Sequence, residues 1–383
     1  MRARVKAPDA TDFSGRLRDA VVTARVGLWL GVCFAIAFLT GLVSHYAQEP
    51  SQPIPFPTSP AWGYRVTQGL HVVSGTAAVP LLLVKLWSVY PQLFRRPPRG
   101  LRALALEGLE RVSIAVLVAT AILQLVMGLQ DVAHWYPWGF SFRAVHYALA
   151  WVVIGSLLVH IAVKLPIIRE ALSTPVTAGE PDAEGRLGRR GLLWTTGAAV
   201  AAAVVTTSGT TVPWLRRVSV LGVRSGDGPQ GLPVNRSATA AGVVPTATSA
   251  DYRLEVVAAD GTTRTFTREE LLAMPQRTET LPIACVEGWS ASATWTGVRL
   301  RDLLDAAGAA SGSDVRVVSL QTRGAFGVTQ LPANFADDDR TLLALRLDGE
   351  TLALDHGYPA RLIAPDRPGV LQTKWVTRLE VQA

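Results

Sequence analysis

The chain has 383 residues, of which 49% are hydrophobic and 17% are charged, and its formal net charge is +7. It is too apolar for an ordinary soluble protein and too polar for one that lies wholly in a membrane, so we expect a membrane part joined to a water-soluble part. Two cysteines exclude a disulfide scaffold, and 33 glycines and 24 prolines without a repeat period exclude collagen-like and solenoid folds.

Five stretches near the N-terminal end lack Asp, Glu, Lys and Arg and are long enough to cross a bilayer, which takes about 20 residues. They are Val26–Ser44, Val66–Val84, Val112–Gln130, Ala144–Val163 and Gly191–Leu215. The sequence therefore predicts an all-α transmembrane bundle followed by a separate domain. The expected parts are a basic N-terminus (1–25), a four-helix membrane domain (26–168), a linker (169–190), a fifth membrane anchor (191–215), an extended connector (216–250) and a C-terminal domain (251–383).

The positive charge is unevenly distributed around these stretches. Lys and Arg gather before the first stretch, between the second and third, and after the fourth, whereas residues 46–63 and 131–142 contain neither. The positive-inside rule places the N-terminus in the cytoplasm, and five crossings then place the C-terminal domain outside. The basic charge is thus a signal of topology and of contact with membrane lipid, and no nucleic-acid signature is present. Arg189 and Arg190 resemble a twin-arginine export signal, the alternative being ordinary positive-inside charge.

Five of the six histidines lie in or beside the apolar stretches. His71 and His146 lie early in the second and fourth stretches, which both run inward, so both are expected in the outer leaflet. Imidazoles from facing helices commonly hold a b-type haem. His160 lies about 21 Å further along the same helix and is a candidate for a second haem, although Lys85 stands where its partner is expected. His45 is an alternative outer ligand. A polar residue hydrogen-bonded within the bundle is the other interpretation of each histidine.

In helix number and histidine placement, residues 26–168 resemble the four-helix cytochrome b membrane subunits of hydrogenases and formate dehydrogenases. The segments VTQGLHVVSG and VHYALAWVVIGSLLVH carry this resemblance. It implies haem b and electron exchange with quinone or a soluble carrier.

From Asp251 the sequence changes to short runs of alternating apolar residues, which predicts an α+β domain with mainly mixed β-sheet. Thr267 and Glu270 form a capping box that opens a short helix, Gly308 caps a second helix, and Asp348-Gly349 makes a hairpin turn. The predicted strands are YRLEVVA, TRTFT, TLPIAC, VRVVSL, TLLALRL, ARLIAP and RLEVQ.

Cys285 is the only cysteine of this domain, because Cys33 lies inside the first apolar stretch and cannot pair with it. A free thiol outside the cytoplasm is expected to be buried or bound. A soft thiolate suits a metal whose remaining donors come from a cofactor, and the alternative is a small buried apolar residue. One cysteine and one histidine give poor support to a zinc site.

The residues around Cys285 match a known family. The segments LPIACVEGWSASATWTGVRLRDLLDAAG and TLLALRLDGETLALDHGYPARLIAPDRPGVLQTKWVTRLEV resemble the molybdopterin-binding domain of the sulfite oxidase family, from about Asn235 onward. The resemblance implies a molybdenum atom held by a pterin dithiolene, with Cys285 as its single protein ligand. It also implies that the pterin and its phosphate are held by Asn235, His356, Gly357, Arg361 and Lys374.

Two departures bring the chain closer to the periplasmic methionine sulfoxide reductase branch of that family. Val-Glu-Gly-Trp-Ser follows Cys285, where sulfite oxidases have Ala-Gly-Asn-Arg and use the arginine to bind sulfite. The sequence also ends with the last strand, where sulfite oxidases continue into a dimerisation domain. Arg323 is a candidate for binding an anionic substrate instead.

The sequence therefore predicts a membrane-anchored, molybdopterin-dependent oxidoreductase. It would transfer an oxygen atom to or from a small sulfur or nitrogen oxide or a sulfoxide, and exchange electrons through a haem at His71 and His146. Two alternatives stay open. One is an electron-transfer cytochrome whose exported domain only binds a partner, and the other is a molybdopterin membrane protein without haem.

Overall fold

The computed structural model describes residues 13, 15, 17–54, 56–177, 187–222 and 228–382. The chain divides into two compact units, and each is built from segments that are distant in sequence. The first unit comprises Met1–Leu39, Leu70–Ser208 and Val218–Leu221. The second comprises Thr40–Gly69, Gly209–Arg217 and Gly222–Ala383.

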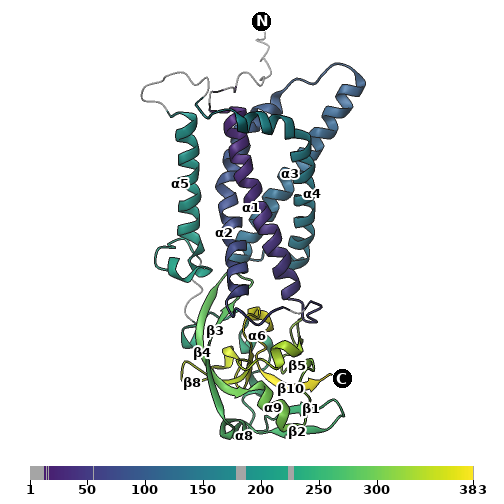
Figure 1. Cartoon of the computed structure of the whole chain (residues 1–383), viewed down its shortest axis with the longest axis vertical. Coiled ribbons are helices and arrows are strands. Elements are labelled where there is room, and N and C mark those ends of the chain that lie inside the picture. Colours follow the sequence, from purple (N-terminus) through teal and green to yellow (C-terminus); the bar gives the residue numbers. More distant parts are fainter. Residues whose placement is uncertain are drawn as a thin grey trace. The chain divides into compact units, whose positions relative to one another are not determined.

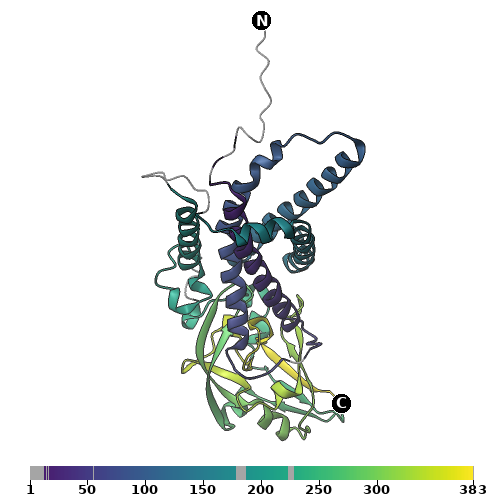
Figure 2. The ribbon, with the colours of Figure 1, turned by 45° about the horizontal axis from the view of Figure 1, so that its top comes forward.

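Five helices of the described residues are long and apolar enough to cross a membrane (Figure 1). They are α1 (Ala20–Ala47), α2 (Gly63–Val89), α3 (Leu101–Val132), α4 (Phe142–Ser173) and α5 (Arg189–Thr207). Within the first unit, α3 and α4 pack against each other, and α1 and α2 run side by side in both views (Figures 1 and 2).

These helices are apolar on all sides. A buried cluster that includes Val26, Phe34, Leu82 and Val153 fills the interior between α1, α2 and α4. Other large apolar side chains of the same helices, such as Leu158, are exposed. A helix that is hydrophobic all round and leaves apolar side chains uncovered is typical of a membrane span, because lipid covers what the protein does not.

The fifth helix is shorter than the predicted span. It ends at Thr207 and is followed by 3-10 turns at Ser208–Thr210 and Pro213–Leu215, so the helix does not reach Leu215. Gly209 weakens helix propagation and Pro213 cannot donate a backbone hydrogen bond, which accounts for the early end. At its other end, Arg189 forms a salt bridge of 2.8 Å with Asp19, just before α1.

The second unit contains two β-sheets. In the first, the strand order is β2-β1-β10-β5-β6, with β1 parallel to β10 and the other pairs antiparallel. Its strands are β1 (Leu254–Val257), β2 (Thr263–Phe266), β5 (Val315–Ser319), β6 (Val328–Leu331) and β10 (Val376–Val381). The second sheet is antiparallel, with the order β3-β4-β7-β8 and β9 on β7. Its strands are β3 (Gln276–Ala284), β4 (Ser290–Arg299), β7 (Leu342–Leu347), β8 (Glu350–Thr351) and β9 (Arg361–Ile363).

A large apolar core joins the two sheets and the short helices α8 (Arg268–Ala273) and α9 (Leu300–Ala306). The predicted capping box opens α8: Glu270 N donates to Thr267 Oγ1 over 3.1 Å, and Thr267 N donates to Glu270 Oε2 over 2.7 Å. The predicted fold class, an apolar helical region followed by a mixed-sheet domain, is confirmed.

The connector before the sheets is not extended throughout. It contains two short helices, α6 (Ala238–Ala241) and α7 (Val244–Ala247), which pack against Trp375 in a small apolar cluster. This segment is therefore part of the sheet domain, because its alanines and valines bury apolar surface that an extended linker would leave in water.

The segment between α1 and α2 also belongs to the second unit. Gln330 N donates to Pro50 O over 2.6 Å, and Asn334 Nδ2 donates to Phe56 O over 2.8 Å. At the start of α2, Asp366 accepts a hydrogen bond from Tyr64 N, as an N-cap carboxylate would. The C-terminal end of α1 and the N-terminal end of α2 thus belong to the same compact unit as the sheets.

Candidate functional site

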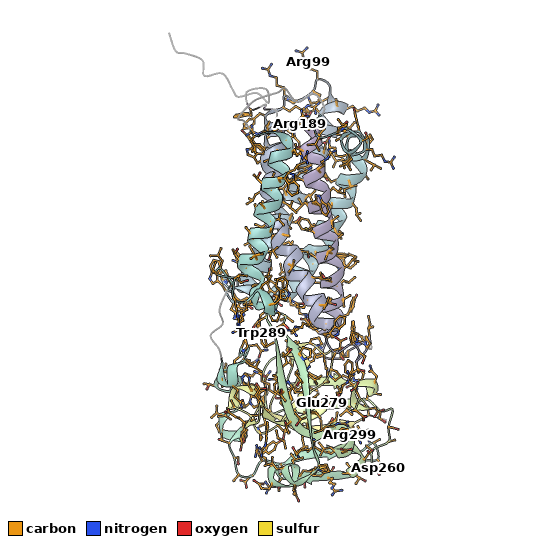
Figure 3. The ribbon with its side chains drawn as sticks, turned by 60° about the vertical axis from the view of Figure 1, so that its left-hand side comes forward. Arg99, Arg189, Asp260, Glu279, Trp289 and Arg299 are labelled. Carbon is orange, nitrogen blue, oxygen red and sulfur yellow. The ribbon has the colours of Figure 1, made fainter. Side chains whose placement is uncertain are left out.

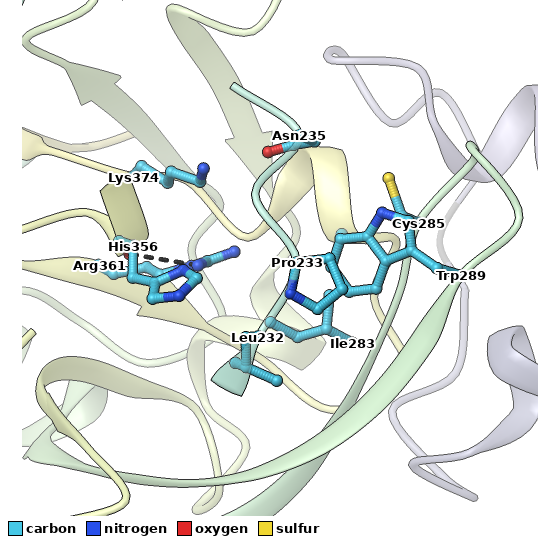
Figure 4. A pocket seen from close by; sticks show the side chains of 10 residues that line it. Leu232, Pro233, Asn235, Ile283, Cys285, Trp289, His356, Arg361 and Lys374 are labelled. Carbon is cyan, nitrogen blue, oxygen red and sulfur yellow. Dashed lines mark hydrogen bonds between the residues drawn. The ribbon is translucent and has the colours of Figure 1, made fainter. Parts of the chain in front are cut away.

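A small pocket lies in the second unit. Five of the predicted site residues line it, and they are Asn235, Cys285, His356, Arg361 and Lys374. Lys374 and Arg361 lie on one side of the pocket, and Cys285 lies with Trp289 on the other (Figure 4). Residues that are distant in sequence therefore meet at one place.

Cys285 directly follows β3 and begins a tight loop, Cys285 to Trp289. The loop is closed by its own backbone: Cys285 N donates to Trp289 O over 2.9 Å, and Gly288 N donates to Cys285 O over 3.2 Å. Cys285 is 1% exposed, and its Sγ lies 3.7 Å from Glu287 Oε2. The thiol is thus held by a short, hydrogen-bonded turn at the pocket wall. Figure 3 shows where this loop meets β4, with Trp289 near one end of the strand and Arg299 near the other.

Arg361 begins β9 and is 4% exposed. Its Nη1 donates to His356 O over 3.2 Å, and the guanidinium lies 5.2 Å from the ring centre of Trp295. Its Nε is buried and has no hydrogen-bond partner among the described residues. Burial lowers the pKa of Arg361 to about 10, so the group is still a cation at neutral pH.

Lys374 reaches the same pocket from the turn before β10. Its Nζ donates to Arg236 O over 2.9 Å and to Asp355 O over 2.8 Å. Burial, and then the charge of Arg361, lower the pKa of Lys374 to about 7. In the part of the chain that the structure describes, neither Arg361 nor Lys374 forms a salt bridge. Burying a cation without a carboxylate partner costs free energy, so this pocket is suited to an anion.

His356 contributes a neutral ring to the pocket. Its Nε2 donates to Pro229 O over 2.5 Å, because a carbonyl oxygen can only accept. Burial, and then the charge of Arg361, lower the pKa of His356 to about 4. The ring is therefore uncharged at neutral pH and acts by hydrogen bonding rather than by charge.

Gly357 allows the backbone to lie close to Lys374 and Arg361. Its φ is +112°, and a Cβ at this position would lie 3.1 Å from Lys374 Cα and 3.2 Å from Arg361 Cβ.

We expect Gly357→Ala to cost about 1–3 kcal/mol of stability and to displace both cations, because it adds backbone strain and a close contact. Thermal unfolding and cofactor content would measure these effects. Gly349→Ala is the control, because Gly349 also has a positive φ but faces open space. Equal losses of stability in Gly357→Ala and Gly349→Ala would show that the close contact of residue 357 with Lys374 and Arg361 does not matter.

The lowered pKa of Lys374 predicts how the cofactor-free protein responds to pH. The folded protein releases the Lys374 proton near pH 7, whereas the unfolded chain holds it to about pH 10.5. The unfolded state binds more protons in this range, so stability should rise with pH, by up to about 1 kcal/mol per pH unit from this group. In melting curves between pH 7 and 10, Lys374→Met should show a shallower slope. Identical slopes for the two proteins would rule out this assignment.

Two histidines of the first unit also face each other. The ring centres of His71 and His146 are 6.2 Å apart, with an angle of 73° between the planes. His71 Nδ1 donates to Ala37 O over 2.8 Å, which leaves Nε2 as the nitrogen with a lone pair. His146 Nδ1 is buried without a hydrogen-bond partner among the described residues. The two rings thus lie close to each other within the helical unit.

The other candidate histidines have different neighbours. The charged groups that interact with His160 are Lys85, Lys164 and Glu110, and no second histidine ring pairs with it among the described residues. His45 lies 3.7 Å from Glu49 in a possible ion pair and packs against a tyrosine ring. The histidine pair of the helical region is therefore His71 with His146.

Sequence analysis missed two residues that lie beside the pocket-lining side chains of Cys285 and Arg361. Glu287 was part of the noted Cys285 segment, but nothing in the sequence places its carboxylate beside the sulfur. Trp295, which lies under Arg361, is on strand β4, which was not predicted because its run of Ser, Ala and Thr has no clear apolar pattern. Arg323, the suggested anion-binding residue, is exposed and is not among the residues that line this pocket.

Comparison with known proteins agrees with this geometry. Residues 241–383 match the family of the oxidoreductase molybdopterin-binding domain. A protein-methionine-sulfoxide reductase subunit named YedZ1, of Azospira oryzae, is 32% identical over 133 residues, which cover 35% of this chain and 50% of that protein. Mitochondrial sulfite oxidase of Drosophila melanogaster is 30% identical over 164 residues, which cover 36% of this chain and 28% of that protein.

Among solved structures, sulfane dehydrogenase SoxCD from Paracoccus pantotrophus is 29% identical, with a TM-score of 0.32, over 35% of this chain and 38% of that one. The chain spans about half the length of YedZ1 and less than a third of sulfite oxidase. Residues 241–383 are thus similar to molybdopterin-binding oxidoreductase domains, and parts of the chain are similar to YedZ1 and to sulfite oxidase.

Proposed function

We propose that the chain is a membrane-anchored molybdenum oxidoreductase that transfers an oxygen atom to or from a small sulfur or nitrogen oxide or a sulfoxide. The observation that carries this proposal is a pocket that combines one thiol with two basic side chains, neither of which forms a salt bridge among the described residues. A bound molybdenum–pterin group would supply the two-electron chemistry of oxygen-atom transfer. Similarity to a methionine-sulfoxide reductase subunit favours a sulfoxide among these substrates.

The donor set fits this cofactor. A thiolate is a soft ligand, so Cys285 would hold the metal. Arg361 and Lys374, on the opposite side of the pocket, would hold the phosphate, because guanidinium and ammonium groups are its usual donors (Figure 4). The unpartnered Nε of Arg361 would gain an acceptor. His356 and Asn235 would contact the pterin as neutral hydrogen-bonding groups.

A b-type haem held by His71 and His146 is the second part of the proposal. A metal–nitrogen bond is about 2 Å long, so two ring centres on opposite sides of one iron should lie roughly 6 Å apart. The observed 6.2 Å agrees with this value. The haem would exchange electrons with quinone or a soluble carrier. We restrict the proposal to one haem, since His160 has no histidine partner in the described part of the chain.

The proposed topology places the N-terminus in the cytoplasm and the sheet domain outside. Arg99 and Arg189 lie at the same end of the helical unit (Figure 3). The segments at the other end, 48–62 and 133–141, contain no Lys or Arg. The sheet domain contacts the first of these segments at Pro50 and Phe56, which supports an outer location under the positive-inside rule. Export would then use the pair Arg189-Arg190.

Metal analysis and a reduced-minus-oxidised absorption spectrum on one purified sample test the proposal. We expect stoichiometric molybdenum and a haem Soret band. Haem without molybdenum would instead identify an electron-transfer cytochrome with a non-catalytic outer domain. Molybdenum without a Soret band would show that the protein binds no haem and that His71 and His146 are structural.

A further inference from the structure

We propose that two side chains from the membrane-helix segments, Gln68 of α2 and Thr211 after α5, are positioning residues for Cys285. The inference rests on the proposed function, because it concerns the loop that would supply the metal ligand. Both contacts lie inside the second unit, which includes the start of α2 and the segment after α5.

The Cys285 loop is too short to satisfy all its own backbone groups. Its internal hydrogen bonds use the carbonyls of Cys285 and Trp289. The carbonyls of Val286 and Gly288 are bonded by side chains from outside the loop. Gln68 Nε2 donates to Val286 O over 3.3 Å, and Thr211 Oγ1 donates to Gly288 O. A loop fixed at both carbonyls, directly after Cys285, leaves the sulfur of Cys285 little freedom to move.

Gln68 is itself held in one orientation. It is 5% exposed, and its Oε1 accepts from Ser44 Oγ over 3.0 Å. Ser44 Oγ is also 2.8 Å from the hydroxyl of Tyr64, and Gln48 Nε2 donates to Ser44 Oγ over 2.6 Å. Because the amide oxygen is fixed in this way, the amide nitrogen is directed at Val286 O. The network thus orients the one donor that reaches the loop.

Thr211 is the second, independent support. It is 3% exposed, and its Cγ2 lies 3.6 Å from where a Cβ on Gly69 would be, so its methyl group faces α2 while its hydroxyl faces Gly288. Two helical segments that are distant in sequence therefore converge on one loop of the sheet domain.

Because Cys285 would be the protein ligand of the metal, a displaced loop would alter the proposed molybdenum centre and slow its electron exchange with the proposed haem. Gln68 would then affect both the position of Cys285 and the rate of this exchange.

Hydrogen–deuterium exchange of the full-length protein tests the positioning without relying on activity. We expect backbone amides of the Cys285 loop to exchange about tenfold faster in Gln68→Leu and in Thr211→Val, which is the effect of losing one hydrogen bond. Thr211→Ser keeps the hydroxyl and should retain wild-type protection. Gln48→Leu is the matched control, because Gln48 belongs to the same network but does not touch the loop.

Two spectroscopic readouts test the functional part. In Gln68→Leu we expect an altered Mo(V) electron paramagnetic resonance signal and slower reoxidation of the haem by substrate, with an unchanged haem spectrum. Hydrogen–deuterium exchange of the loop amides at the wild-type rate in both Gln68→Leu and Thr211→Val would overturn the inference. Absence of molybdenum or haem from the wild-type protein would overturn the proposed function instead, while the exchange experiment would still decide the role of the two side chains.

Discussion

Replacing Cys285 by serine should abolish oxidoreductase activity and leave the haem spectrum unchanged. A serine hydroxyl is a hard donor that does not ionise near neutral pH, so it cannot replace a soft thiolate. We expect activity to fall by at least about a hundredfold, since loss of an outer-shell partner alone costs a metal site about 10–100-fold. Activity, molybdenum content and the Soret band are measured on the same sample.

Cys33→Ser provides the control for this experiment. Cys33 lies in α1 and belongs to the first unit, whereas the pocket residues belong to the second unit. It should keep both the molybdenum and the activity. Turnover at the wild-type rate in Cys285→Ser would contradict the assignment of Cys285 as the metal ligand.

Replacing His146 by leucine should remove the Soret band while molybdenum stays bound. A leucine has no lone pair for iron, and His71 alone would leave one axial position empty. The two proposed centres would be held by different units of the chain, so loss of one should leave the other in place. Electron flow from a membrane carrier should then stop, whereas turnover with an artificial donor that reaches the pocket directly should continue.

His160→Leu and His45→Leu separate this assignment from its alternatives. His160 interacts with Lys85, Lys164 and Glu110, and His45 lies beside Glu49 and Tyr46. Both variants should keep the full Soret absorbance. A loss of about half the haem in His160→Leu would instead indicate a second haem, and a complete loss in His45→Leu would make His45 the outer ligand.

The charge of the pocket explains why the cofactor and the fold should stabilise each other. Arg361 is buried and Lys374 is largely enclosed, and their own hydrogen bonds go to backbone carbonyls. Without an anion, compensation comes from these carbonyl dipoles, from the ring faces of Trp295 and Trp375 and, for Lys374, from the nearby Asp355 and Glu287. A phosphate would remove this penalty, so cofactor binding should raise the melting temperature and the pKa of Lys374.

Much of the architecture follows from local sequence signals. A bilayer requires a continuous apolar run, and such a run is visible without knowledge of its neighbours, which is why the five helices were predicted. The capping box at Thr267 and the hairpin turn at Asp348-Gly349 are likewise local, because the residues that form each are within a few positions of one another.

The tertiary structure alone decided the features that depend on distant partners. Strand β4 was not predicted because its small and polar residues become a strand only through pairing with β3 and β7. The family resemblance named Cys285, Arg361 and Lys374, but their common pocket, and the absence of salt bridges to the two cations among the described residues, are visible only when the chain is folded. The hydrogen bonds from Gln68 and Thr211 to the Cys285 loop could not be predicted from the sequence, because a glutamine or threonine near a helix end is common. Only the folded chain brings each of these side chains to a backbone carbonyl that needs a donor.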